Sequence, residues 1–181
     1  MKFCLLYQII YIKKILNNTI KTIRNNFQEI VLKTHRFKVK GVVHFLKDST
    51  IIQGKQLIDL IVYDKPGSYR FFVTYLFLSV MLNVRINLGI NTNELKPLWS
   101  ISNLFSSSVW SEREVFDMYG IIFLESTDLR RILTDYGFKG YPLRKDFPLA
   151  GFVELFYADT YSNISYKKVS FVQAYRKLTS Y

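Results

Sequence analysis

The chain has 181 residues, a formal net charge of +11 at pH 7 and a single cysteine, Cys4. This length accommodates one domain with a hydrophobic core, together with extensions. A single cysteine excludes a disulfide within the chain. It also excludes an iron–sulfur cluster held by this chain alone, because such clusters need about four thiolates.

The N-terminal third holds most of the basic excess and the first predicted helix. Residues 1–47 contain eight Lys and two Arg against Glu29 alone, whereas the rest of the chain is nearly balanced. Apolar residues recur here at three- and four-residue spacing, which predicts an amphipathic helix over residues 7–26. Such a basic helix is either a solvated surface or a contact for RNA or for anionic lipid headgroups.

A strand, a helix and three further strands are predicted next. Residues 29–34 alternate as a short strand, and apolar residues at helical spacing predict a helix over residues 38–47. Residues 57–64 and 69–81 flank a Pro-Gly turn, which predicts an antiparallel hairpin. Residues 83–90 alternate strictly, which predicts an antiparallel strand with one solvated face.

These elements predict an α+β domain over residues 1–124, with a mainly antiparallel sheet and helices on one face. The apolar run at residues 71–82 is too short to cross a bilayer, which takes roughly 20 residues. A second run, at residues 3–12, has no small-residue cleavage site after it. We therefore expect no transmembrane segment and no secretory signal.

A short helix is predicted to begin directly after Ser111. Ser111 and Glu114 have the spacing of a capping box, in which each side chain bonds the backbone amide of the other residue. Trp110 and Val115 are spaced to form a hydrophobic staple over the entry to the helix. Gly120 suits the left-handed residue that ends a helix, so the helix would have about two turns.

Three carboxylates in this helix are the first candidates for chemistry. Glu112, Glu114 and Asp117 have the composition of a hard-cation site or an acid–base pair. Glu112 and Glu114, however, lie about 200° apart around a helix axis and do not converge, so we interpret these carboxylates as structural. His35 and His44 stand in no nucleophile motif and are interpreted as surface residues. No glycine-rich phosphate loop supports nucleotide binding.

The stretch at residues 128–151, the meander, has no helical or strand period. Charges of both signs alternate there with large apolar residues, glycines and prolines. A loop of this length is usually functional or lies against another surface. Extended segments are predicted at residues 152–157 and 166–169. Residues 125–181 are therefore predicted to form a long irregular meander and an extended C-terminal tail, both of which bind partners.

The motifs of this region resemble those of one family. ERE at residues 112–114 is followed by DMYG at 117–120 and by DLRRILTDYGFKGYPLRKDFPLAG at 128–151. Together they resemble the signature of the 30 kDa subunit (mitochondrial subunit 9) of NADH:ubiquinone oxidoreductase, respiratory complex I. The chain departs from the family pattern in two places: Ser126-Thr127 replaces His-Pro, and Tyr141 replaces a His.

The resemblance implies a core subunit of the peripheral, matrix-side arm of complex I at the mitochondrial inner membrane. It implies no catalytic residue, metal or cofactor in this chain, with FMN and the iron–sulfur clusters in other subunits. Its partners would be the large quinone-site subunit and the adjacent iron–sulfur subunits of the Q module. By bracing them, the chain would support NADH-to-ubiquinone electron transfer coupled to proton translocation. Frequent Phe, Tyr, Met, Ile, Asn and Lys, the amino-acid bias of an A/T-rich genome, indicate an organellar or an A/T-rich bacterial gene, and a mitochondrial gene agrees with this bias.

The charged and aromatic residues around the meander are the predicted subunit interface. Arg and aromatic side chains are enriched at protein interfaces. The alternative is a set of exposed ion pairs, each worth about 0–1 kcal/mol. The predicted interface residues are Glu112, Arg113, Asp117, Asp128, Arg130, Arg131, Asp135, Tyr141, Arg144, Lys145, Asp146, Phe147 and Arg176.

Two further functions are compatible with parts of the sequence. A basic N-terminal third with many aromatic residues is compatible with an RNA-binding, ribosome-associated module, because such surfaces bind phosphates and stack bases. A carboxylate enzyme would require Glu112 and Glu114 to converge, which a helix does not allow. We therefore expect a subunit interface, no contact with nucleic acid, and attachment to the membrane through the complex.

Overall fold

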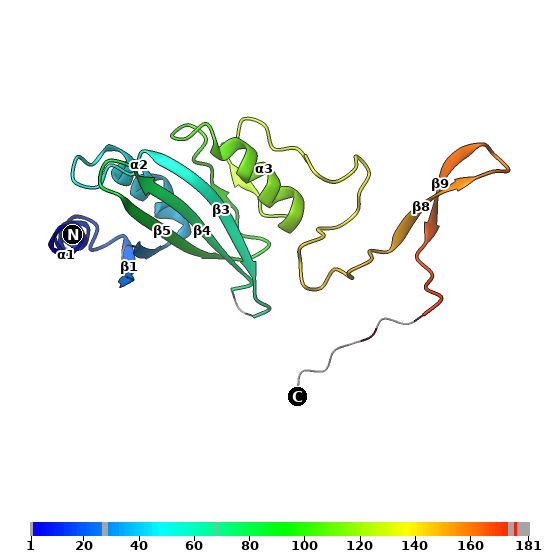
Figure 1. The fold of residues 1–181 in the computed structure, drawn as a ribbon, viewed down its shortest axis with the longest axis horizontal. Helices are drawn as coiled ribbons and strands as arrows, with labels where there is room; N and C mark the ends of the chain where they lie inside the picture. Colours follow the sequence, from blue (N-terminus) through cyan, green and yellow to red (C-terminus); the bar gives the residue numbers. More distant parts are fainter. Residues whose placement is uncertain (1, 27–28, 68, 174–175, 177–181) are drawn as a thin grey trace. The chain divides into compact units, whose positions relative to one another are not determined.

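A five-stranded sheet forms the framework of the N-terminal part of the chain (Figure 1). Its spatial order is β1-β2-β5-β4-β3, and only the pairing of β2 with β5 is parallel. The predicted α+β class with a mainly antiparallel sheet is confirmed. The strands are β1 (Ile20–Asn26), β2 (Glu29–Thr34), β3 (Gln56–Asp64), β4 (Phe71–Ser79) and β5 (Val84–Thr92).

The computed structural model describes residues 2–26, 29–67, 69–173 and 176. It divides into two compact units, Met1–Lys145 and Asp146–Tyr181. The first unit thus extends past residue 124, the predicted end of the α+β domain. Among the described residues, no helix has the length and apolar character needed to cross a membrane.

The predicted helix over residues 7–26 is wrong in its second half. Helix α1 spans Lys2–Ile15, and the chain then turns and enters β1, which pairs with β2. Asn17 and Asn18 favour turns over helix interiors, and β-branched residues such as Ile20 and Ile23 favour strands. The apolar spacing continues through the turn because both elements bury residues in the same core.

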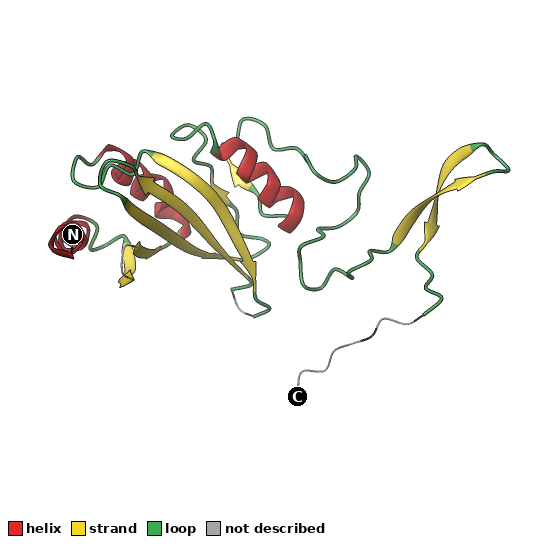
Figure 2. Cartoon of the chain, in the orientation of Figure 1, coloured by secondary structure: helices red, strands yellow, loops and turns green. Residues whose placement is uncertain are grey.

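The next predicted elements are confirmed. A 3₁₀ turn, η1 (Arg36–Lys38), leads into helix α2 (Val39–Asp48), whose buried residues include Val42 and Val43. Strands β3 and β4 form the predicted hairpin, and β5 pairs with β4 in antiparallel fashion. Side chains alternate strictly along β4, so its inward residues join those of α2 in one core. Figure 2 shows the helices and the sheet of this unit in red and yellow.

Helix α3 (Ser108–Tyr119) begins earlier than predicted, and the capping box is absent. The residue before the helix is Ser107, whose side chain makes no capping bond, and Ser111 lies inside the helix. The predicted staple is also wrong, because Trp110 is 65% exposed. Gly120 ends the helix as predicted, with φ 75°, and its N–H donates to Phe116 O.

Two short strands flank α3, and one hairpin forms the core of the second unit. Strands β6 (Leu98–Trp99) and β7 (Phe123–Leu124) pair in parallel fashion. The predicted extended segments after the meander pair as an antiparallel hairpin, β8 (Val153–Ala158) with β9 (Asn163–Lys168), drawn in orange in Figure 1. As predicted, residues 128–151 contain no helix or strand. The tail motif at residues 173–176 lies partly outside the described residues.

Candidate functional site

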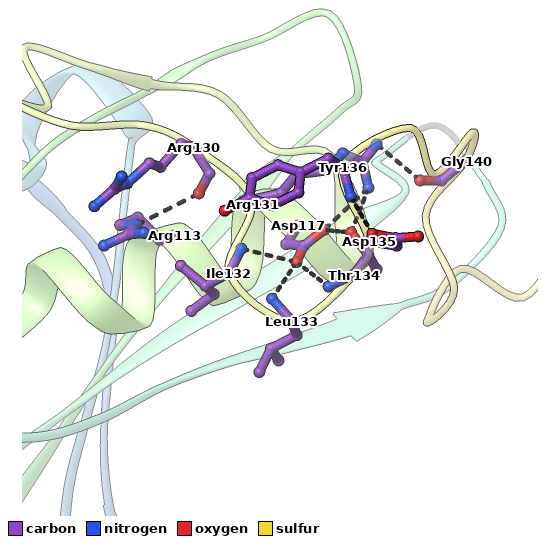
Figure 3. Close-up of polar contacts among 10 residues, drawn as sticks. All are labelled: Arg113, Asp117, Arg130, Arg131, Ile132, Leu133, Thr134, Asp135, Tyr136 and Gly140. Carbon is purple, nitrogen blue, oxygen red and sulfur yellow. Dashed lines mark hydrogen bonds and ion pairs between the residues drawn. The ribbon is translucent and has the colours of Figure 1, made fainter.

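Asp117 attaches the meander to the last turn of α3. Its side chain is fully buried. One carboxylate oxygen, Oδ2, accepts three consecutive backbone N–H groups, from Ile132 at 3.1 Å, Leu133 at 2.8 Å and Thr134 at 2.9 Å. The other, Oδ1, accepts from the Thr134 hydroxyl and from Arg131 Nη1 at 3.0 Å. Figure 3 shows these donors gathered around one carboxylate.

The donors determine the charge state of Asp117. Burial by itself would raise the pKa of this carboxyl group, because it disfavours the charged form. Hydrogen bonds from the Thr134 hydroxyl and from the amides of Thr134, Leu133 and Ile132 outweigh burial and lower the pKa to about 2. Asp117 is therefore an ionised anchor at neutral pH, with Arg131 as its counter-ion.

Arg131 connects this anchor to the second half of the meander. Its Nη1 donates to Asp117, and its Nη2 donates to Gly140 O at 3.0 Å. The guanidinium also lies 5.1 Å from the ring centroid of Tyr141 and 5.9 Å from that of Phe138. A planar guanidinium donates hydrogen bonds from its edges and packs its face on aromatic rings, which suits it to this position, where a lysine would supply only a point charge.

Arg144 attaches the meander to the C-terminal end of α3. Its Nε donates to Tyr119 O at 2.6 Å, and its Nη1 lies 3.2 Å from Glu94 Oε2. Its guanidinium lies 4.3 Å from the ring centroid of Tyr141. Gly120 makes this approach possible, because a Cβ there would lie 2.6 Å from Arg144 Nη2 and from Tyr141 Cζ.

A third attachment comes from the end of β3. Arg70 donates to both carboxylate oxygens of Asp64, at 3.0 and 3.1 Å, and it also pairs with Glu94. Asp64 Oδ2 additionally accepts the Lys145 amide at 2.8 Å. Sequence reasoning missed these residues: Asp64, Arg70 and Glu94 lie at strand ends and in loops, without a motif or a period to connect them. The only local signal was an acidic residue beside the predicted hairpin turn.

Glu112 and Arg113 also have their partners inside the chain. Glu112 is fully buried and accepts from the Ser100 hydroxyl at 2.6 Å and from the Ile101 amide at 2.9 Å. Burial raises the pKa of Glu112 despite these hydrogen bonds. Arg113, which is 6% exposed, donates through Nε to Arg130 O and lies over the ring of Trp110.

The carboxylates of α3 therefore face different surroundings. Glu112 and Asp117 are buried with separate sets of donors, whereas Glu114 is exposed. Among the described residues, no group of three or more His, Cys, Asp or Glu is placed to hold a metal ion. His35 and His44 are both exposed, and His44 Nδ1 lies 2.8 Å from Asp48 Oδ2 on the next turn of α2.

The predicted interface residues thus fall into two groups. Glu112, Arg113 and Asp117 are buried, and Arg131 and Arg144 are largely covered by the chain itself. The remaining residues reach the surface, at least in part: Asp128, Arg130, Asp135, Tyr141, Lys145, Asp146, Phe147 and Arg176. Arg130 is the clearest case, with a side chain that is 70% exposed.

Comparison with known proteins identifies the family of this chain. Residues 32–153 match the family model described as the respiratory-chain NADH dehydrogenase, 30 Kd subunit. The chain belongs to this family. The matched range begins in β2 and includes the sheet strands β3 to β5, helices α2 and α3 and the whole meander, so it covers the positions of the anchoring residues described above.

Relatives in this family are similar over most of their length. A NADH-quinone oxidoreductase subunit of Paramagnetospirillum magneticum is 44% identical over 153 residues, which cover 84% of this chain and 77% of the relative. A relative of the same name from Chelativorans sp. is 40% identical over 167 residues, covering 92% and 84%. A chain of the archaeal membrane-bound sulfane sulfur reductase shares the fold, with a TM-score of 0.65, 19% identity, and coverage of 77% of this chain and 85% of that chain.

Proposed function

We propose that the chain is a core subunit of the peripheral arm of mitochondrial complex I, on the matrix side of the inner membrane. In this role it carries no catalytic residue and no cofactor; FMN and the iron–sulfur clusters belong to other subunits. It braces the large quinone-site subunit and the adjacent iron–sulfur subunits during NADH-to-ubiquinone electron transfer coupled to proton translocation. Membership of the 30 Kd family supports assembly into complex I. The amino-acid bias typical of an A/T-rich genome supports a mitochondrial gene.

The exposed apolar surface of the second unit is the observation that carries this proposal. Its hairpin leaves large apolar side chains in water, among them Tyr157 at 60% and Tyr166 at 68% exposure. A two-stranded hairpin is at best marginally stable by itself, and contiguous exposed apolar surface marks a binding site. A partner chain that covers this hairpin would supply the burial that two strands lack. This is the expected property of a bracing subunit.

The first unit contributes a surface of fixed shape. Asp117, Arg131 and Arg144 act from inside by holding the meander in one conformation, so little ordering entropy is lost when a partner binds. The partner-facing group is then the exposed part of the predicted interface. We propose that it consists of Asp128, Arg130, Asp135, Tyr141 and Lys145 in the first unit. Asp146, Phe147 and Arg176, which belong to the second unit, are proposed to face partners as well.

The assembly is tested by native-gel mass spectrometry of the membrane fraction. We expect the chain to migrate with an assembly that oxidises NADH and reduces ubiquinone, in mitochondrial membranes. Migration apart from any NADH-oxidising assembly would contradict the proposal. Association with ribosomes that is lost on RNase treatment or at moderate salt would favour the RNA-binding alternative instead.

The proposed interface is tested by reversing one exposed charge. Arg130→Glu should lower the yield of assembled, quinone-reducing complex severalfold, because a like charge placed against a complementary partner surface is repelled. Lys55→Glu is the matched control, since Lys55 is exposed and lies outside the meander. Equal yields from the two variants would show that Arg130 faces solvent in the assembly.

A further inference from the structure

A basic cavity of about 300 Å³ lies in the first unit, and its described lining contains no residue of the meander. Strands β1 and β2 contribute Lys21 and Lys33, the turn η1 contributes Arg36, and the loop after β5 contributes Lys96. His35 also lines the cavity. Among the described residues of its lining, none is acidic. Three of these cations belong to the N-terminal third, whose positive charge the proposed interface does not use.

The positive charge in this cavity is concentrated and is not neutralised. Among the described residues, none of the four Lys and Arg side chains takes part in an ion pair. Like charges gathered around one concave surface repel each other, and the field of such a cleft attracts anions. An anionic ligand would relieve this repulsion.

Aromatic rings hold the cations in position. Arg36 lies 4.1 Å from the ring centroid of Phe37, Lys33 lies 5.3 Å from that of Phe72, and Lys96 lies 5.7 Å from that of Tyr69. A ring orients a cation without cancelling its charge. Because cations already occupy a face of each ring, this arrangement favours an anionic group over a stacked nucleobase.

The floor of the cavity is shaped by a glycine on β5. Gly89 is paired with Lys33 across the parallel β2–β5 ladder. A Cβ at Gly89 would lie 2.4 Å from Phe72 Cζ, so the ring of Phe72 packs directly over the backbone there. This packing holds the Phe72 ring in place near the Lys33 ammonium. The neutral donors Thr22 and Asn91 complete the lining near the cations.

We propose that this cavity binds a phosphate-bearing anion. Lys and Arg are the residues that bind phosphate, and the Arg36 fork can donate two parallel hydrogen bonds to it. A volume of about 300 Å³ is at the lower end of the range for small-molecule sites, roughly 300–1,000 Å³, and suits a phosphate or diphosphate group. The group can belong to a soluble molecule or to the headgroup of an anionic lipid.

The test measures pyrophosphate binding to the full chain by isothermal titration calorimetry. We expect saturable binding that weakens at least tenfold in the double variant Lys33→Gln/Arg36→Gln. The control double variant Lys55→Gln/Lys167→Gln has the same net charge but alters exposed lysines outside the cavity, and it should bind like the wild type. Thermal unfolding of both variants confirms that each is folded.

A second measurement distinguishes the two sources of phosphate. The same proteins are sedimented with phosphatidylcholine vesicles, with and without phosphatidic acid. Binding to phosphatidic acid that is lost only in the cavity variant assigns the site to a lipid headgroup, whereas pyrophosphate binding without vesicle binding assigns it to a soluble molecule. Absence of saturable pyrophosphate binding, or equal binding by both double variants, would overturn the proposal. So would preference for an acidic peptide, which would assign the cavity to a protein partner.

Discussion

At the scale of single residues, one buried carboxylate determines the course of the meander. Asp117 accepts three backbone amides, a hydroxyl and a guanidinium, which no exposed ion pair among the described residues matches. Exposed pairs such as Arg130 with Asp128 contribute about 0–1 kcal/mol each. Removing one member of a buried pair costs more, because the other member loses its partner without regaining full hydration.

Asp117→Asn should therefore lower the free energy of unfolding by about 2–4 kcal/mol at neutral pH. Asparagine keeps the shape, but it removes the charge that faces Arg131 and replaces one acceptor with a donor. Urea denaturation measures the change. Glu114→Gln on the same helix is the control, and it should change stability by less than about 0.5 kcal/mol because Glu114 is exposed.

The effect of Asp117→Asn should also depend on pH. The pKa of Asp117 is about 2 in the folded chain, below the value of about 3.9 in an unfolded chain, so ionisation favours folding. This contribution, on the order of 2 kcal/mol, is complete above the unfolded pKa and disappears as pH falls through the folded pKa. The stability gap between wild type and variant should stay constant from pH 7 to about 5 and narrow toward pH 2. A gap of constant size throughout would show that Asp117 is not preferentially ionised in the fold.

At the scale of elements, the C-terminal end of α3 is where the helix, the meander and the sheet meet. Gly120 has the left-handed conformation, and Tyr141 and Arg144 pack where its Cβ would be. The backbone adds a further contact, since the Leu143 amide donates to Met118 O at 3.2 Å. The helix cap and the docking of the meander therefore depend on the same glycine.

Gly120→Ala should lower the free energy of unfolding by at least about 1–2 kcal/mol, the cost of a left-handed conformation for a residue with a Cβ. The displaced Tyr141 and Arg144 should add to this loss. Gly41→Ala is the matched control, because Gly41 lies in α2 with no atom near its Cβ position. The free energy of unfolding of the Gly41→Ala variant should rise by about 0.5–1 kcal/mol, since alanine favours a helix. Similar stability of the two variants would contradict the assigned role of Gly120.

At the scale of the whole molecule, the two units should differ in how far they are ordered without partners. The meander between Asp128 and Lys145 has hydrogen bonds to α3 and to β3 within the chain. The hairpin β8–β9 has a single ladder and many exposed apolar side chains. Order in the first unit is therefore intrinsic, whereas we expect order in the second to depend on the assembly.

Hydrogen exchange tests this difference. The amides of residues 132–134 should exchange slowly both in the free chain and in the assembled complex, because Asp117 binds them in either state. The amides of residues 153–168 should exchange fast in the free chain and slowly in the complex. Slow exchange of the hairpin in the free chain would show that it folds without a partner.

Local sequence patterns were sufficient to predict an element wherever its structure depends mainly on its own residues. The alternation in β2 and β5, the Pro-Gly turn between β3 and β4 and the helical spacing of α2 predicted the α+β framework, because burial on one face imposes these periods. Gly120 was predicted to end α3 because glycine readily adopts the left-handed conformation at the end of a helix. The motifs of residues 112–151 were also sufficient to identify the family that the comparisons then established.

Contacts between distant residues decided the rest. Apolar spacing cannot tell one helix over residues 7–26 from a helix, a turn and a strand that bury the same residues, and only pairing with β2 separates them. The carboxylate of Glu112 can be buried because distant donors, Ser100 and Ile101, bind it, and no local rule anticipates them. The same is true of Asp64, which binds a residue 81 positions away. The sequence by itself determined the family and the sheet, whereas the tertiary structure decided which charges hold the meander from within and which remain at the surface, because burial depends on the assembled fold.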